Sequence, residues 1–524
     1  MSRARVDPEL IKLFSAMKTS DSKTGSTRGV AASLHDDSAR DILKELPAVG
    51  PATYLSSLEV LIADVDTDGF EYLVEHKDVH AISDGEALCK IPKPLEVEEN
   101  SIFTSRELMR GDTELFSEME GRGITVGVID TGVFQTHSAF GGRVLEQVNC
   151  VGDSLSGDTS GHGTHVAGSI AGEDIGVASE AEILDLRVFG QGYGASTSSI
   201  LTALETSISR KVDVVNMSLG STVRSVVLES AVDQVANEGI VVCVAAGNDG
   251  RHASINSPSS ARGAICVAAT DSNGKVASFS SKGPCSWHPW PKPDCAGFGV
   301  DVMSASDSGG NCVMSGTSMA TPGIAGVVAC LLEHQKENDE AGALVEWLLR
   351  NAGEPHGQTH EQVGIGFISL EGLDSYVGGA GGLEGMAQKK KSKKSPKNFF
   401  QETIVKCETC KNARIVHKVV HLSDNSVRIN MSCVKCRKLD SEGNLELEEV
   451  ILENWRHVRV TDKQFLSSLR LCGGCGKKGL VPVESEDIGL DSKYHPHSAV
   501  TVGCIHCGGK GMRKIPTRLA DIWN

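Results

Sequence analysis

The chain has 524 residues, of which 40% are hydrophobic and 57 are glycine, and its formal net charge at pH 7 is −17. This length exceeds one ordinary domain and suggests about three. The negative charge argues against a general nucleic-acid coat protein or a membrane-surface binder. The N-terminal residues lack an apolar run typical of a signal peptide, and no stretch approaches the roughly 18 apolar residues that span a bilayer. We therefore expect a soluble, cytoplasmic protein with no membrane partner.

The first hundred residues divide into two parts. Residues 1–50 are polar, with clusters of Ser, Gly and Asp, and we expect a flexible N-terminal segment there. Within residues 51–100, the apolar runs at 58–65 and 79–82 predict two strands, and residues 68–76 have helical spacing with an Asp cap. These elements predict a small α+β domain ahead of the main one.

The central part of the chain alternates short apolar runs with stretches of helix length. The apolar runs include residues 124–130, 182–189, 213–220, 240–247 and 264–270. Amphipathic spacers separate them, for example 198–211 and 225–239. Continuous apolar strands between helices predict an α/β fold, a mostly parallel sheet with helices on both faces, over residues 101–377. A linker rich in Gly and Lys follows at 378–398.

Three motifs in this domain have potential for catalysis. Asp130 ends an apolar strand before Thr-Gly, which places a carboxylate at the edge where parallel sheets build their sites. His162 stands between glycines at the start of a small-residue helix, so a substrate can approach it closely. His165, one turn further, fits a packed structural role better. Ser318 would stand at the N-terminus of a helix, whose field favours developing negative charge.

The chain order Asp, His, Ser, with the long motifs around these residues, resembles the subtilase family of serine proteases over about residues 120–375. The resemblance implies that Ser318 attacks the scissile carbonyl, that His162 takes its proton, and that Asp130 orients the imidazole. It also implies a protein or peptide as substrate and no catalytic cofactor.

Further positions carry over from the same resemblance. The Asn248 amide and the Ser318 backbone N–H would form the oxyanion hole. Two edge strands that pair with an extended peptide would comprise Ser218, Leu219 and Gly220, and Gly192, Tyr193 and Gly194. The pocket for the residue before the cut would be lined by Ala245, Ala246 and Gly247. The sequence does not define the opposite wall of this pocket, near Asn256, and therefore does not predict the substrate preference.

The segment after His162 lacks the Asn-rich insertion that ligates calcium in secreted subtilisins, and it is more similar to the proteinase K branch. That calcium site is therefore not expected, although calcium elsewhere stays open. The unit at 51–100 resembles the inhibitory propeptide of subtilases. The resemblance implies packing on the protease, a C-terminal end in the active site, and autocleavage between about Ala87 and Ser101. An accessory subdomain is the alternative.

The C-terminal part contains half of the 16 cysteines, as four C-x-x-C pairs. The pairs are Cys407 and Cys410, Cys433 and Cys436, Cys472 and Cys475, and Cys504 and Cys507. Spacers of 22 and 28 residues predict two zinc ribbons, at 399–460 and 461–524, each a closed four-thiolate structural zinc site. Domains this small need metal for stability. The other eight cysteines are scattered, and we expect buried, reduced thiols.

The sequence thus predicts an intracellular subtilisin-like serine endopeptidase. Its N-terminal unit would inhibit it or be processed, and its zinc-ribbon tail would recruit a substrate or a protein partner. Two alternatives are a catalytically silent scaffold with the same fold, and a nucleic-acid-tethered protease in which the zinc tail is the primary module.

Overall fold

The computed structural model describes residues 4–19, 27–34, 39–91, 102–190, 194–288, 291–337, 353 and 355–379, together with six strands within 414–516. Two compact units divide the chain, Met1–Gly379 and Ala380–Asn524. The larger unit contains the main domain and a smaller N-terminal domain. Among the described residues, no helix combines the length and the apolar character needed to cross a membrane.

A seven-stranded sheet forms the centre of the main domain, in the order β15-β14-β13-β12-β8-β10-β9. Its strands are β8 (Thr125–Asp130), β9 (Val144–Asn149), β10 (Glu182–Arg187), β12 (Val214–Met217), β13 (Val241–Ala245), β14 (Ala264–Thr270) and β15 (Cys295–Phe298). Every neighbouring pair is parallel. The central strands are buried on both faces, which explains their continuous apolar sequence.

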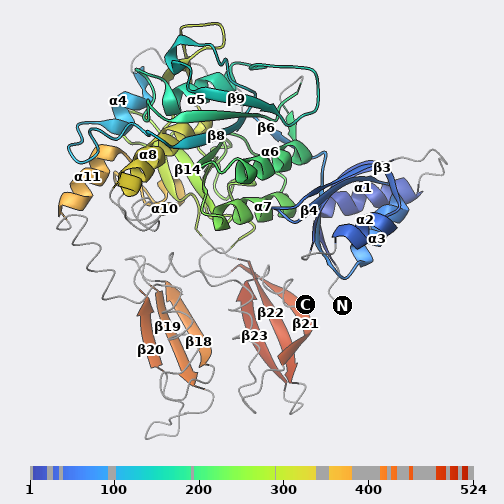
Figure 1. Ribbon diagram of the computed structural model, residues 1–524. Coiled ribbons are helices and arrows are strands. Elements are labelled where there is room, and N and C mark those ends of the chain that lie inside the picture. Colours follow the sequence, from blue (N-terminus) through green and yellow to red (C-terminus); the bar gives the residue numbers. More distant parts are fainter. Residues whose placement is uncertain are drawn as a thin grey trace, which may run out of the picture. The chain divides into compact units, whose positions relative to one another are not determined.

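Helices cover both faces of this sheet (Figure 1). Helices α6 (Thr197–Ser209) and α7 (Val226–Asn237) pack together, and α5 (His162–Ala171) packs against α8 (Thr317–Glu337). Smaller elements are α4 (Ser105–Arg110), η1 (Ser138–Phe140), α10 (His360–Val363), α11 (Leu370–Gly379), and a sheet of β7 (Phe103–Thr104), β16 (Val302–Ala305) and β17 (Asn311–Met314). The predicted α/β fold is confirmed.

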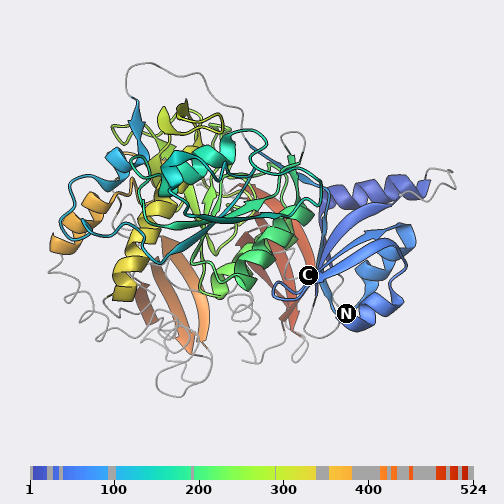
Figure 2. The same ribbon diagram turned by 45° about the horizontal axis from the view of Figure 1, so that its top comes forward.

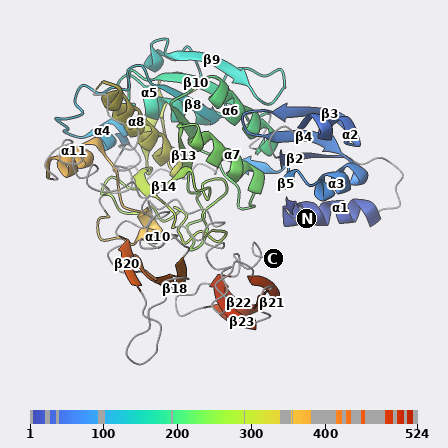
Figure 3. The same ribbon diagram turned by 60° about the horizontal axis from the view of Figure 1, so that its bottom comes forward.

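The N-terminal domain has a five-stranded sheet in the order β1-β5-β2-β4-β3. Its strands are β1 (Arg5–Val6), β2 (Arg28–Leu34), β3 (Ala48–Leu55), β4 (Val60–Val65) and β5 (Val79–Asp84), and its helices are α1 (Pro8–Thr19), α2 (Ala39–Glu45) and α3 (Thr67–Glu75). One face of the sheet contacts α6 and α7, and its own helices lie on the far side (Figures 2 and 3).

The structure differs here from the expectation for residues 1–50. This segment supplies two helices, two of the five strands and the start of a third, so the domain begins near residue 4 and not at 51. Apolar side chains spaced among the polar ones explain the difference. Leu10, Phe14 and Ile42 are buried in the core of the domain, and the rings of Phe14 and Phe70 stack at 3.9 Å. Asp66, rather than Asp68, caps α3.

The C-terminal unit contains two antiparallel three-stranded sheets. One comprises β18 (Arg414–His421), β19 (Val427–Cys433) and β20 (Glu448–Leu452), and the other β21 (Leu480–Leu490), β22 (Pro496–Cys504) and β23 (Lys510–Pro516). Cys433 and Cys504 end described strands, whereas the other six predicted zinc ligands lie outside the described residues. The linker predicted at 378–398 lies almost entirely outside them as well.

Candidate active site

The three candidate catalytic residues lie at the ends of three separate elements. Asp130 is the last residue of the central strand β8, His162 the first residue of α5, and Ser318 the second residue of α8. The first turn of α5 and the loop after β8 approach each other closely. A Cβ atom on Gly163 would lie only 2.1 Å from the Gly132 carbonyl oxygen. The glycine beside His162 is therefore required by packing.

Asp130 and His162 form a buried pair. The His162 Nδ1 atom lies 2.7 Å from the Asp130 Oδ1 atom, and the two residues are 7% and 0% exposed. This contact makes Nδ1 the protonated nitrogen, so Nε2 is left as an acceptor. Within the part of the chain that the structure describes, Nε2 is buried without a hydrogen-bond partner. A base with a fixed tautomer and a free acceptor atom is what proton abstraction from a hydroxyl requires.

Ser318 is held by the neighbouring strand. Its hydroxyl donates to the Ser218 carbonyl at 3.1 Å, so the proton must turn toward His162 before transfer. The Ser218 hydroxyl donates in return to the Ser318 carbonyl at 2.8 Å. In a regular helix that carbonyl would accept from residue 322, which is a proline and has no N–H. Ser218 therefore supplies the donor that Pro322 lacks, and it fixes the first turn of α8.

The side chain of Asn248 is oriented by Thr317. The Asn248 Oδ1 atom accepts from the Thr317 backbone N–H at 3.0 Å and from its hydroxyl at 2.7 Å. The Nδ2 atom is buried and has no acceptor among the described residues. It lies 3.1 Å from where a Gly316 Cβ would stand, beside the N-terminus of α8. An unused, oriented donor at this position suits an oxyanion.

His165 has a structural role. Its ring is fully buried, with Nε2 2.9 Å from the Val302 carbonyl oxygen, and burial lowers its pKa to about 4. It is therefore a neutral structural residue at physiological pH, in agreement with the sequence-based expectation.

Two further acids behind the pair were missed by the sequence reasoning. The Asp158 carboxylate accepts from the Thr131 hydroxyl at 2.7 Å and from the backbone N–H of Gly161 at 2.9 Å, which joins the loops that carry Asp130 and His162. The Asp185 carboxyl accepts from the Val133 backbone N–H at 2.9 Å, and burial raises its pKa to about 7. The Thr131–Asp158 and Val133–Asp185 contacts join residues distant in sequence, and the local pattern gave no signal for them.

The predicted substrate-binding strands are paired with the chain's own segment β6 (Leu88–Lys90). This segment is antiparallel to β11 (Gly194–Ser196), with Lys90 opposite Gly194, and Lys90 also bridges to Gly220. Gly192 and Tyr193 lie outside the described residues. The segment before residue 92 thus lies between the two edges where a substrate peptide was expected.

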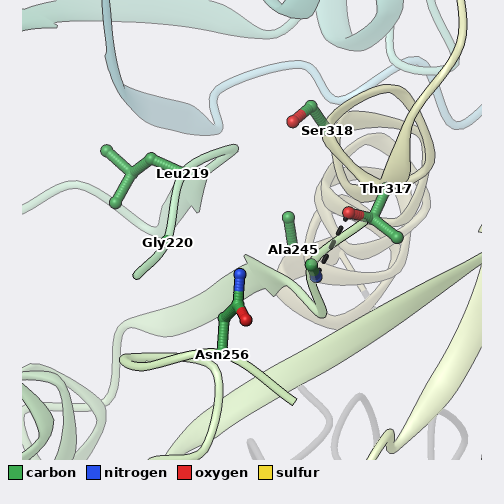
Figure 4. A pocket seen from close by; sticks show the side chains of 7 residues that line it. Leu219, Gly220, Ala245, Asn256, Thr317 and Ser318 are labelled. Atoms are coloured by element: carbon green, nitrogen blue, oxygen red, sulfur yellow. Dashed lines mark hydrogen bonds between the residues drawn. The ribbon is translucent and has the colours of Figure 1, made fainter. Parts of the chain in front are cut away.

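A small pocket opens beside Ser318 (Figure 4). Its lining residues are Leu219, Gly220, Ala245, Gly247, Asn256, Thr317 and Ser318. Ala246 is a correction to the predicted lining, because its side chain is buried in a core cluster with Ile255 and Cys266. Successive residues of a strand face opposite sides, so Ala245 and Ala246 do not share the pocket.

The scattered cysteines are small buried side chains. All eight are unpaired, and all are buried except Cys312, which is half-buried. Burial raises the pKa of the Cys89, Cys243 and Cys330 thiols to about 12, so these stay protonated. In the described ranges, no three His, Cys, Asp or Glu side chains gather to hold a metal ion.

Residues 121–367 match the subtilase family of peptidases. Over 234 residues the chain is 39% identical to subtilisin-like protease 2 of Pseudogymnoascus destructans, which covers 44% of this chain and 56% of the relative. It is also 39% identical over 229 residues to subtilisin-like protease 5 of Trichophyton tonsurans, covering 42% of this chain and 56% of that protein. The chain thus spans about half the length of these curated relatives.

Two solved structures are similar to the chain. A cold-adapted subtilisin-like serine proteinase is 31% identical and covers 52% of this chain and 99% of its own, with a TM-score of 0.45. The epidermin leader peptide processing serine protease of Staphylococcus aureus is 19% identical and covers 67% and 99%, with a TM-score of 0.53, which indicates the same fold. The family match over residues 121–367 and the identity to subtilisin-like proteases show that this part of the chain is a subtilase-family domain.

Proposed function

We propose that the protein is a serine endopeptidase that hydrolyses peptide bonds through an acyl-enzyme. The observation that carries this proposal is the buried Asp130–His162 pair, whose Nε2 atom has no partner among the described residues, within a stretch that matches the subtilase family. A scaffold that had lost catalysis would have no need of an oriented base with an unused acceptor. The complete set of groups therefore favours an enzyme over the catalytically silent alternative.

The reaction follows from these groups. The Ser318 Oγ atom adds to the scissile carbonyl carbon while its proton passes to His162 Nε2, and Asp130 stabilises the imidazolium. The Asn248 Nδ2 atom and the Ser318 backbone N–H donate to the oxyanion. The leaving amine takes the proton from His162. Water then attacks the acyl-enzyme by the same route and releases the acid.

We further propose that the N-terminal domain inhibits the enzyme by holding β6 in the substrate cleft. Its sheet shares one apolar cluster with α6 and α7, to which Ala31, Val60 and Ala81 contribute. The Glu205 carboxylate of α6 accepts from the backbone N–H groups of Ser57 at 3.0 Å and Leu58 at 3.1 Å.

The two helix N-termini that face this domain are also satisfied by it. The Gly85 and Ala87 carbonyls accept from the first backbone N–H groups of α6, at 3.0 and 2.9 Å. The Ser83 hydroxyl accepts from the backbone N–H of Val227 in α7 at 3.1 Å. Such contacts anchor the strand that leads directly into β6. While these contacts hold β6 in place, a substrate peptide cannot pair with Gly220.

Intact mass over time tests both proposals, with the purified chain beside Ser318→Ala and beside Ser209→Ala, an exposed serine on α6. We expect the chain and Ser209→Ala to lose the N-terminal domain, with a cut after Ile91 and before about Ser101, a range outside the described residues. Ser318→Ala should stay intact. If all three stay intact, a denatured generic protein is offered next. Cleavage of this added protein would support the protease proposal without self-processing. If the added protein stays intact, the catalytically silent scaffold is favoured.

We propose that the C-terminal unit holds two structural zinc ions, through the four C-x-x-C pairs, and recruits a substrate or protein partner. Support comes from the ligand spacing and from the two small antiparallel sheets, in which Cys433 and Cys504 end strands. Elemental analysis should find two zinc ions per chain, and one in Cys504→Ser. Nucleic-acid binding by the full chain that weakens with salt would favour the tethered alternative.

We also propose that the enzyme works in a reducing compartment. The eight scattered cysteines from Cys89 to Cys330 support this, since none forms a disulfide and seven are buried. Alkylation of the denatured protein from its source should modify every thiol except those bound to zinc. Disulfides among the eight would overturn this proposal.

A further inference from the structure

The pocket beside Ser318 is shallow. Its volume is about 10 Å³, close to the lower limit for holding one water molecule. Figure 4 shows Leu219 and Gly220 on one side, Thr317 and Ser318 on the other, and Asn256 reaching up between them. Because the pocket adjoins the nucleophile and the strand that pairs with a peptide, it receives the side chain before the cut.

Asn256 occupies the space that neighbouring glycines leave. A Cβ on Gly247 would lie 2.6 Å from the end of the Asn256 amide, and a Cβ on Gly220 would lie 3.2 Å from the Asn256 Cβ. Either alanine would collide with or crowd this side chain. The two glycines therefore open a cavity, and Asn256 fills most of it.

Hydrogen bonds hold the Asn256 amide in place. Both ends of the amide are satisfied when its nitrogen donates to the Asp249 carboxylate at 3.3 Å and to the Ser254 carbonyl at 3.2 Å. The amide oxygen is then the atom beside Gly220 and Gly247, at the wall of the pocket. A carbonyl oxygen there repels a carboxylate and accepts from a hydroxyl.

We propose that Asn256 determines specificity, and that it restricts the residue before the cut to small uncharged side chains such as Ala and Ser. Leu, Phe and Lys are too long for the remaining space, and Glu meets both the amide oxygen and, behind it, Asp249. This inference rests on the proposed peptidase function and names its substrate class.

The test uses the self-processed full chain and a series of peptides that differ only in the residue before the cut: Ala, Ser, Leu, Phe, Lys and Glu. We expect kcat/KM for Ala and Ser to exceed that for Phe by at least about tenfold, because burying the ring requires displacing Asn256. Asn256→Gly should raise kcat/KM for Phe by about tenfold or more and leave Ala within a few-fold. Asn256→Ala gives an intermediate result and serves if the glycine variant folds poorly.

Asn273→Gly, in an exposed turn, is the matched control and should leave the Phe-to-Ala ratio unchanged. A native preference for Phe or Leu would overturn the inference, as would a ratio that stays constant in Asn256→Gly and Asn256→Ala. In both cases, measurable hydrolysis of any of the peptides would still support the peptidase proposal. If the native chain turns over no peptide, or turns peptides over no faster than Ser318→Ala, both proposals fail together.

Discussion

Lys90 and Gly220 exchange two backbone hydrogen bonds, from Lys90 N–H to the Gly220 carbonyl at 2.9 Å and from Gly220 N–H to the Lys90 carbonyl at 3.3 Å. This pairing places β6, the strand that follows the N-terminal domain, on the edge that a substrate peptide would use. Cys89, between its exposed neighbours Leu88 and Lys90, is 2% exposed and points into the protease. Under the proposed inhibition, β6 and a substrate peptide would compete for the same backbone groups.

Glu205→Ala should weaken the docking of the N-terminal domain. Hydrogen bonds to a charged acceptor contribute about 1.5–3 kcal/mol, and Glu205 accepts two from backbone N–H groups, so docking should weaken roughly 10-fold or more. The measurable result is an earlier onset of peptide cleavage by the full chain. Glu238→Ala is the control, because Glu238 is exposed at the end of α7 and bonds only within that helix, to Gln234. Equal onset times in the two variants would remove Glu205 from the docking surface.

Asp130→Asn should lower kcat by about 10⁴, since an amide beside Nδ1 no longer holds the productive tautomer of His162. The thermal midpoint should change little, because the substitution preserves shape. Asp112→Asn, at an exposed position, should have native kcat. A loss below tenfold for Asp130→Asn would show that another group orients the imidazole.

The elements that carry the candidate catalytic residues could be predicted because these residues lie in continuous motifs. Asp130 follows an apolar strand, and Ser318 begins a helix rich in small residues. The contacts of Asp158 with the Thr131 hydroxyl and of Glu205 with the Ser57 backbone N–H could not be predicted, because the fold alone brings these distant donors to the two carboxylates. Local pattern describes how an element forms, but not which element it will meet.

Two expectations that differ from the structure have specific causes. The segment 1–50 is polar on average, yet Leu10 and Phe14 are spaced so that one face of α1 is buried. Average composition conceals such a face. Ala246 was assigned to the pocket with its neighbours, but side chains alternate at the end of β13, and it faces the core. Membership of a motif does not determine the direction of each side chain.

Asn248→Ala should reduce kcat by about 10²–10³ with little change in KM, because the lost donor acts on the oxyanion and not on the bound substrate. Thr317→Val is the companion variant. It removes one of the two contacts that orient the amide but keeps Nδ2, so its loss in kcat should be smaller. A larger loss in Thr317→Val than in Asn248→Ala would indicate that the asparagine acts mainly by supporting α8.

Docking of the N-terminal domain should also depend on pH through Asp7. This carboxyl is 6% exposed at the contact with α7, where it faces Ser83, the Val226 backbone N–H, Arg224 and Glu229. Burial raises its pKa from the ordinary 3.8 to about 6. The docked form therefore binds more protons than the free form between these values. The stability that this group contributes is complete below about pH 3.8 and is lost as the pH rises through about 6.

Asp7→Asn mimics the protonated side chain and separates this effect from other titrations. In the Ser318→Ala background, which excludes cleavage, the thermal midpoint of the chain with Asp7 should fall relative to Asp7→Asn between about pH 4 and 6.5, and then stay parallel to it. Asp41→Asn, an exposed substitution in the same domain, should show no such divergence. If the two curves stay parallel throughout, the charge of Asp7 is solvated in the docked form. Divergence would mean that rising pH loosens the inhibitory domain, so activation would be favoured at neutral over acidic pH.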